Sequence, residues 1–183
     1  MSRTPLGMVL AILLVSIAAL SSSVPTARAI TTIYIQADGT ISPANAPIQS
    51  NGDVYTLTGN INSDADGIVI ERNNTVLDGA GYTLQGTNTP SSTGIYASGI
   101  SNVTIRDIDV KAFESGIVLD AYSTFNQIIK NKVEDNDFGI NCWAYSDSNS
   151  IIGNNITANH LVGIWIVGSS DINVSENNII GNS

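Results

Sequence analysis

The sequence contains one cysteine and one histidine, and its two methionines fall within the first eight residues. A single cysteine excludes an internal disulfide, so the fold does not depend on covalent cross-links. Copper sites draw on Cys, His and Met side chains. Cys142 follows Ile140 by two positions and is expected to point into the core, whereas His160 lies in a turn before Gly163. The sequence therefore predicts no metal site and no cofactor.

Cations are the second scarcity. The chain has 7 Lys+Arg against 16 Asp+Glu. Two of the cations, Arg3 and Arg28, lie near the N-terminus, and residues 30–183 without them carry a net charge of −11. Such a surface repels polyanions and anionic lipid, and it favours solubility outside the cell. The charge therefore excludes nucleic acid as an expected partner.

Long apolar runs are also missing, apart from Met8–Leu20. This run has 13 residues, which is short of the roughly 20 that a membrane-spanning helix requires. Arg3 precedes it, and the A-x-A pattern Ala27–Ala29 follows, as in a secretory signal peptide. We predict a signal peptide at residues 1–29, with an uncleaved anchor as the alternative. Cleavage would leave a secreted or cell-surface protein without a membrane span.

No window beyond the signal peptide shows a helical period. Apolar positions instead recur at a step of 23 residues in two columns, which are Ile105, Ile128, Ile151, Val174 and Val110, Val133, Ile156, Ile179. Gly-Ile pairs recur at steps of 27, 22, 23 and 24 residues, at Gly67, Gly94, Gly116, Gly139 and Gly163. The longest step contains the polar stretch Gly86–Ser92, which we expect to be a loop.

Each Gly-Ile pair marks one strand, and two further short apolar segments follow it before the next pair. The turns between these segments are rich in Asn, Ser, Asp and Gly, which tolerate positive φ. Three short strands in each coil of about 23 residues predict an all-β fold, a parallel β-helix. Each coil of such a solenoid buries its apolar residues by stacking on its neighbours.

Asparagine keeps the same step in two columns, which are Asn131, Asn154, Asn177 and Asn136, Asn159, Asn182. An inward asparagine can bond the turn backbone and stack on the amide of the next coil. Ile108 holds the corresponding position one coil before Asn131. We therefore predict a structural ladder that begins at Asn131.

The repeat defines the expected domain organisation. Residues 30–66 are less regular and are predicted to form an N-terminal cap, which a solenoid needs to cover its first coil. Residues 67–183 are the β-helix repeats. The next Gly-Ile pair is due a few residues after Ser183, so we expect the repeats to be truncated at the C-terminus.

The strings SNSIIGNNITAN at Ser148–Asn159 and GIWI at Gly163–Ile166 resemble the repeat of the NosD-type right-handed β-helix proteins. These proteins belong to the wider pectin-lyase-like superfamily. The segments IYIQADG at Ile33–Gly39 and DVYTLT at Asp53–Thr58 resemble the cap of secreted archaeal members. The resemblance implies a right-handed coil. The family it implies includes polysaccharide lyases and hydrolases, a copper-linked periplasmic maturation factor and many surface proteins, so it does not select an activity.

Strand alternation places two columns of the Gly-Ile strands outward. One is Val69, Tyr96, Val118, Asn141, Trp165, and the other is Glu71, Ser98, Asp120, Trp143, Val167. This surface mixes aromatic and carboxylate side chains, as a sugar-binding surface does. The sequence therefore predicts a ligand-binding site made of Tyr96, Asp120, Asn141, Trp143 and Trp165.

Catalysis at this surface would require a carboxylate pair. Glu71 and Asp120 are two coils apart, about 9.6 Å at the sheet spacing, at the top of the roughly 6.5–9.5 Å range of inverting glycosidases. The Gly-His-Gly and Arg-x-Lys elements of the hydrolase members do not occur, and no acidic cluster with a basic residue suits the lyase members. We therefore predict no catalytic residue.

Three hypotheses for function follow. The first is an exported, non-enzymatic β-helix module that binds polysaccharide or a cell-surface protein through its aromatic and acidic flank. The second is a fragment of a carbohydrate-active enzyme, a polysaccharide lyase or glycoside hydrolase, whose catalytic coils are missing. The third is a structural spacer at the cell surface.

Overall fold

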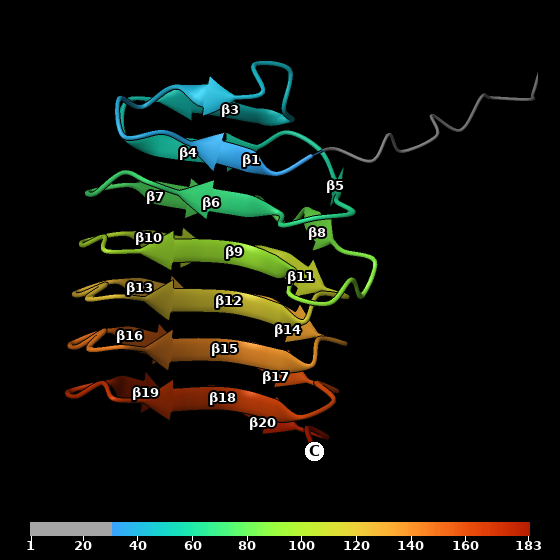
Figure 1. Ribbon diagram of the computed structural model, residues 1–183, viewed down its shortest axis with the longest axis vertical. Helices are drawn as coiled ribbons and strands as arrows, with labels where there is room; N and C mark the ends of the chain where they lie inside the picture. Colours follow the sequence, from blue (N-terminus) through green and yellow to red (C-terminus); the bar gives the residue numbers. More distant parts are fainter. Residues whose placement is uncertain (1–30) are drawn as a thin grey trace, which may run out of the picture.

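The computed structural model describes residues 31–183, so the predicted signal peptide at 1–29 lies outside the described residues. All regular structure in this part of the chain is β, in 20 short strands. They stack into a rod of six coils, and each coil gives one strand to each of three sheets (Figure 1). The predicted all-β parallel β-helix with three strands per coil is confirmed.

The first sheet has the order β18-β15-β12-β9-β6-β1-β2, with the bounds Val162–Val167, Phe138–Trp143, Ser115–Asp120, Thr93–Ser98, Ile68–Ile70, Ile33–Ile35 and Ile41–Ser42. The second sheet has the order β19-β16-β13-β10-β7-β4-β3, with the bounds Asn173–Ser175, Ser150–Ile152, Gln127–Ile129, Thr104–Arg106, Val76–Asp78, Val54–Leu57 and Ile48–Asn51. The third sheet has the order β20-β17-β14-β11-β8-β5, with the bounds Asn178–Ile180, Asn155–Thr157, Lys132–Glu134, Asp109–Lys111, Thr83–Gln85 and Ile61–Asn62.

The 23-residue step is the register of the second and third sheets. In the second sheet Ile105 pairs with Ile128, Ile128 with Ile151, and Ile151 with Val174. In the third sheet the partners run in the same way through Val110, Val133, Ile156 and Ile179. These side chains point into the rod, and Ile105, Ile128 and Ile151 are fully buried. Stacking of like residues therefore builds one continuous apolar core.

Asn131, Asn154 and Asn177 form a ladder at the corner between the second and third sheets. Each Oδ1 accepts a hydrogen bond from the backbone N–H 23 residues earlier, at 3.2, 2.9 and 2.8 Å. Each Nδ2 donates to the carbonyl 26 residues earlier, at 2.9, 2.8 and 2.7 Å. The first N–H of the series belongs to Ile108, so the ladder begins at Asn131 as predicted. The inward orientation is confirmed, since Asn131 and Asn154 are buried.

Two other corners carry ladders of the same kind. Asn136, Asn159 and Asn182 bond in the same pattern between the third and first sheets. Asn126 and Asn149 do so between the first and second sheets, where the sequence interpretation had no column. This third ladder has only these two members, because Val103 and Ile172 hold the adjoining positions. Every corner of the central coils therefore satisfies its backbone through inward asparagine.

The glycines of the Gly-Ile pairs form a column that allows the coils to approach closely. A Cβ atom on Gly67, Gly94, Gly116 or Gly139 would lie 2.3–2.6 Å from the carbonyl oxygen of the column glycine in the next coil. No side chain fits at that distance. The recurrence of glycine is therefore a steric requirement of stacking, in addition to marking where a strand begins.

The predicted cap, residues 30–66, supplies a complete coil as well as a cover. Its strands β1, β4 and β5 pair in parallel with β6, β7 and β8. Its strands β2 and β3 run antiparallel to β1 and β4 at the end of the rod. The predicted loop at Gly86–Ser92 lies between β8 and β9, outside the strands.

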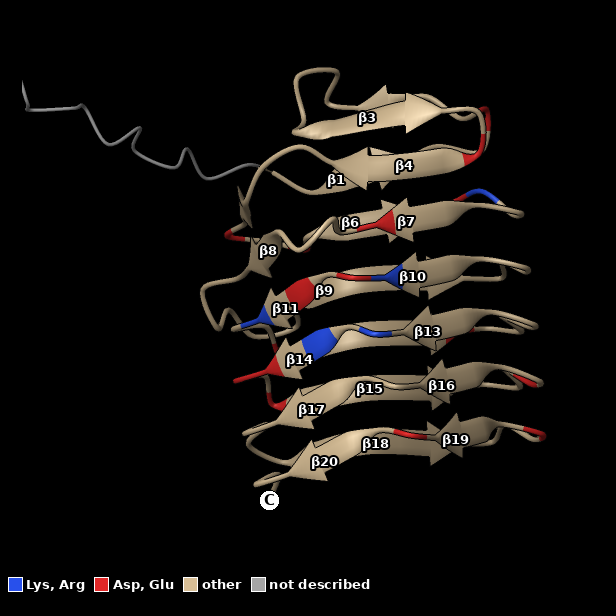
Figure 2. Cartoon of the chain, turned by 180° about the vertical axis from the view of Figure 1, so that it is seen from behind, with Lys and Arg blue, Asp and Glu red and all other residues tan. Residues whose placement is uncertain are grey.

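Cations gather on the second and third sheets and their turns, where Figure 2 shows them on β10, β11 and β14. Arg106 pairs with Asp78 at 2.8 Å, and Lys132 pairs with Asp109 and Glu134. In residues 31–183 no helix combines the length and hydropathy needed to cross a membrane.

Candidate functional site

The flank is the outer surface of the first sheet over β6, β9, β12, β15 and β18. The backbone register confirms the first predicted column, whose successive partners are Val69, Tyr96, Val118, Asn141 and Trp165. In the second column Ser98 pairs with Asp120, and Trp143 pairs with Val167. These five strands contain no Lys or Arg, and Asp120 is their only carboxylate. The sheet therefore brings the predicted site residues to one weakly charged surface.

The expectation that Asn141 is open to solvent is wrong, because its side chain is fully buried. Trp165, its register partner in the next coil, lies between two aromatic rings of β15. The Trp165 ring stacks on Phe138 at a centroid distance of 5.0 Å and meets Trp143 edge-on at 5.5 Å. These rings lie on either side of Asn141 along the strand, so the indole of Trp165 covers the amide.

Phe138 belongs to this aromatic cluster, although strand alternation placed it inward. A Cβ on Gly139 would meet the core atom Ile156 Cγ2 at 3.1 Å, so Gly139 faces inward, as Ile140 does. Two consecutive inward positions reverse the alternation, and Phe138 is left on the outside. The cluster of Phe138, Trp143 and Trp165 is the largest aromatic contact on the flank, and Trp165 is 40% exposed.

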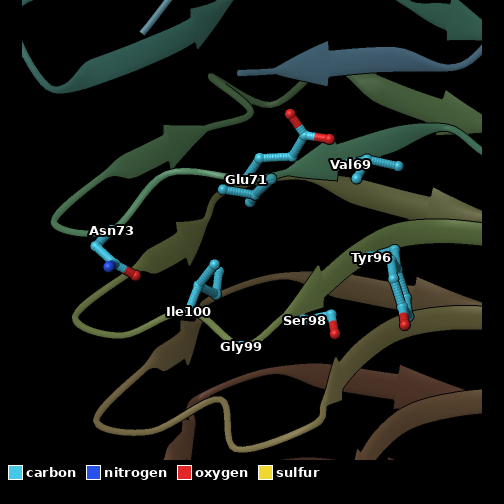
Figure 3. Close-up of a pocket in the computed structure, with 8 residues that line it drawn as sticks. Val69, Glu71, Asn73, Tyr96, Ser98, Gly99 and Ile100 are labelled. Carbon is cyan, nitrogen blue, oxygen red and sulfur yellow. The ribbon is translucent and has the colours of Figure 1, made fainter. Parts of the chain in front are cut away.

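A recess of about 300 Å³ opens at the other end of the flank, between coils 2 and 3 (Figure 3). Its lining comes from β6, β9 and the residues that follow them, and comprises Val69, Ile70, Glu71, Asn73, Tyr96, Ser98, Gly99 and Ile100. Its walls thus combine aliphatic and aromatic carbon with one carboxylate, one amide, one phenol and one hydroxyl. The sequence did not indicate this recess, because it arises from the path of the turns after β6 and β9.

Tyr96 and Asp120 connect the recess to the rest of the flank. The Tyr96 hydroxyl donates a hydrogen bond to Asp120 Oδ2 at 3.0 Å, and the Ala121 N–H donates to Asp120 Oδ1 at 2.8 Å. Burial raises the pKa of the Tyr96 phenol, so this group stays protonated and remains a donor at neutral pH. Both oxygens of Asp120 thus have a donor within the protein, which favours a positioning role for this carboxylate.

A second aromatic group, missed by the sequence interpretation, lies at the corner between the first and second sheets. Tyr122, Phe125 and Tyr145 are 68%, 65% and 61% exposed. The rings of Tyr122 and Tyr145 stack with centroids 5.4 Å apart and planes 13° from parallel. All three residues have positive φ, between 58° and 65°. Bulky residues adopt this conformation at a cost of about 1–2 kcal/mol each, so their presence on the surface calls for a local reason.

The two tyrosines are one-residue insertions. Ser123 Oγ and Ser146 Oγ accept bonds from backbone N–H groups 23 residues earlier, so these serines occupy equivalent places in successive coils. Ser169 continues the series in coil 6, where Gly168 alone separates it from β18. In coils 4 and 5 an Ala-Tyr pair fills that space. The repeated Ala-Tyr-Ser at a step of 23 residues was the available signal in the sequence.

The metal-ligand candidates are far from forming a site. Cys142 is fully buried in the core, and burial raises the pKa of its thiol to about 12. His160 is exposed, with Nδ1 3.2 Å from Asp137 Oδ1. Over residues 31–183 there is no group of three or more His, Cys, Asp and Glu side chains that could hold a metal ion.

The buried thiol gives a simple test of the packing. We expect Cys142 in the native protein to react with Ellman's reagent at pH 8 at least about 100-fold more slowly than in the unfolded chain, because the thiolate is the reacting form. The measurement is absorbance against time with and without guanidinium chloride. Rapid labelling of a chain that keeps its native circular dichroism would contradict the inward position.

Comparison with protein families places this geometry in a known group. The family model described as right handed beta helix region matches residues 32–179, which span all six coils. Comparison with curated proteins and with solved structures gives no significant match. The match covers most of the chain and agrees with the three parallel sheets, and the chain therefore belongs to the right-handed β-helix family.

Proposed function

We propose that this protein is an exported, non-enzymatic β-helix module that binds neutral polysaccharide through its flank. The observation that carries the proposal is the aromatic cluster of Phe138, Trp143 and Trp165 on a surface formed by rigid parallel strands. Tryptophan gives a large apolar contact at low entropic cost, which is why it is frequent at binding surfaces. The apolar face of a sugar ring suits such a contact.

The polar groups of the flank supply the complementary interactions. The recess adds the Glu71 carboxylate, the Asn73 amide and the Ser98 hydroxyl, all labelled in Figure 3. These groups can donate to or accept from sugar hydroxyls. Because the flank strands contain no cation, the surface favours an uncharged glycan over an acidic one. The exposed corner tyrosines extend the aromatic surface beyond Asp120 and Trp143.

Export and the finer family placement belong to the same proposal. Their support is the signal-peptide layout of residues 1–29 and the repeat strings that resemble NosD-type proteins of the pectin-lyase-like superfamily and secreted archaeal members. A module of this kind would present the flank outside the cell, to polysaccharide or to a glycosylated surface partner.

A glycan array tests the proposal directly. We expect the double variant Trp143→Ala/Trp165→Ala to lose at least about tenfold in affinity for the neutral glycans that the wild-type protein binds, because truncated aromatic anchors commonly cost that much. Tyr82→Ala is the matched control, since Tyr82 is an exposed aromatic residue between β7 and β8, away from the flank. Binding that survives the double substitution would count against the flank as the site.

Polysaccharide cleavage is the second candidate, because the recess contains Glu71 beside the Tyr96–Asp120 pair. It predicts hydrolysis of a neutral polysaccharide by the wild-type chain that Glu71→Gln abolishes. Reducing-sugar assays across a substrate panel separate the two candidates, since a binding module retains its glycans without releasing new ends.

A further inference from the structure

Asn141 is a polar residue in a position that the preceding coil fills with valine. Its register partner there is Val118, which is 3% exposed. The Asn141 Nδ2 donates to Ser115 Oγ at 3.2 Å, but its Oδ1 has no hydrogen-bond partner among the described residues. A buried acceptor without a partner carries the full desolvation penalty of that group. The stack would therefore accept an apolar side chain here more readily than the amide.

A second unpartnered group lies two residues along the same strand. Trp143 Nε1 is a buried donor without a partner, and it shares the outer face of β15 with Asn141. The described residues contain four such buried atoms, and two of them meet at this point of the flank. One is an acceptor and the other a donor, and the indole of Trp165 lies against both residues.

We propose that Asn141 Oδ1 and Trp143 Nε1 form a hydroxyl-recognition site beneath Trp165, for vicinal hydroxyls of a neutral pyranose. This inference rests on the proposed function and assigns the polar contacts of the same flank. A hydroxyl both donates and accepts, so one sugar hydroxyl donates to Asn141 Oδ1 while its neighbour accepts from Trp143 Nε1. Ammonium groups cannot accept and carboxylates cannot donate, so neither satisfies both atoms.

Trp165 is the cover of this site. Asn141 is fully buried while Trp165 is 40% exposed, so the indole must turn aside before a ligand reaches the amide. Its contacts with Phe138 and Trp143 on the flank are aromatic, and a sugar ring that enters replaces them by stacking on the displaced indole. The site is therefore closed without ligand and opens as the sugar binds.

The central test is Asn141→Val, which installs the side chain type that coil 4 already uses. We expect the midpoint of thermal unfolding to rise by about 2–4 °C, because the unsatisfied acceptor is removed. We expect affinity for cellohexaose or mannohexaose, whichever the wild-type chain binds, to fall at least about tenfold. Asn155→Val on the third sheet is the matched control, and it should leave glycan affinity unchanged.

The indole N–H signals give an independent readout, because the chain contains two tryptophans. Trp165→Phe assigns the signal of Trp143 in ¹⁵N-labelled protein. Titration of the wild-type chain with the bound hexasaccharide should shift the Trp143 Nε1–H resonance downfield as it gains an acceptor. No shift at saturation would overturn the site.

The outcomes separate this inference from the proposed function. Failure of the wild-type chain to bind any neutral glycan would remove both. Binding that Asn141→Val retains in full, or a lower unfolding temperature in that variant, would remove the hydroxyl site while leaving the aromatic flank in place.

Discussion

Replacement of Asn154 by leucine should destabilise the protein by about 2–5 kcal/mol, since each buried group left without a partner costs about 1–3 kcal/mol. Asn154 Oδ1 accepts from both the backbone and the side-chain nitrogen of Asn131, at 2.9 and 3.0 Å. Its Nδ2 donates to the Ile128 carbonyl at 2.8 Å. Leucine has a similar volume but satisfies none of these groups. The free energy of unfolding, measured by denaturant titration, checks the loss.

Asn155→Leu is the control for that measurement. Asn155 lies next to Asn154 but faces outward, and its Oδ1 accepts one exposed bond from Asn178. We expect its substitution to change stability by less than about 0.5 kcal/mol. Equal effects at the two positions would mean that the ladder contributes no more than a surface asparagine does.

Gly139→Ala should cost about 3 kcal/mol, although it adds a single methyl group. The new Cβ would lie 2.3 Å from the Gly163 carbonyl oxygen and 3.1 Å from Ile156 Cγ2. The nearest obstacle is backbone of the neighbouring coil, which relaxes only if the strands β15 and β18 move apart. Thermal unfolding of the purified variant, or its loss from the soluble fraction, measures this effect.

Gly59→Ala is the matched glycine substitution. A Cβ there meets only Pro47 Cβ at 3.8 Å, an ordinary contact, and its φ is not positive. Stability should therefore stay within about 1 kcal/mol of the wild type, with a small gain from the stiffer unfolded chain. Tolerance of alanine at Gly139 as well would show that the coils can separate to admit a side chain.

The sequence was sufficient to predict the core because the fold repeats one local solution. Ile128 and Asn131 keep fixed places in each coil, so their spacing already encodes the strand register and the ladder. The ladder at Asn126 and Asn149 escaped notice because two members define one step and no series. The glycine column was noticed at Gly116 and Gly139, but its cause, a carbonyl in the next coil, is visible only in three dimensions.

The site was less predictable than the core. Alternation placed Tyr96 and Asp120 together on the flank, and their hydrogen bond follows from that placement. The burial of Asn141 depends on how the Trp165 ring turns, which spacing does not determine. Phe138 depends on a reversal of alternation at a glycine. Features that rest on one side chain's orientation, or on one exception to the repeat, lie outside what periodicity can specify.

Tandem duplication or loss of 23 codons in the central coils would leave every interface between coils chemically unchanged. Each asparagine bonds only to the adjacent coil, and each glycine admits only the carbonyl of its neighbour. A new coil would therefore meet the same donors, acceptors and steric limits as the coil it copies. The consecutive Ala-Tyr-Ser corners at 121–123 and 144–146 have the form that such an event leaves behind. Natural selection can thus lengthen the rod in whole coils, and each added coil offers a fresh set of outward positions on which recognition can vary while the interior stays constant.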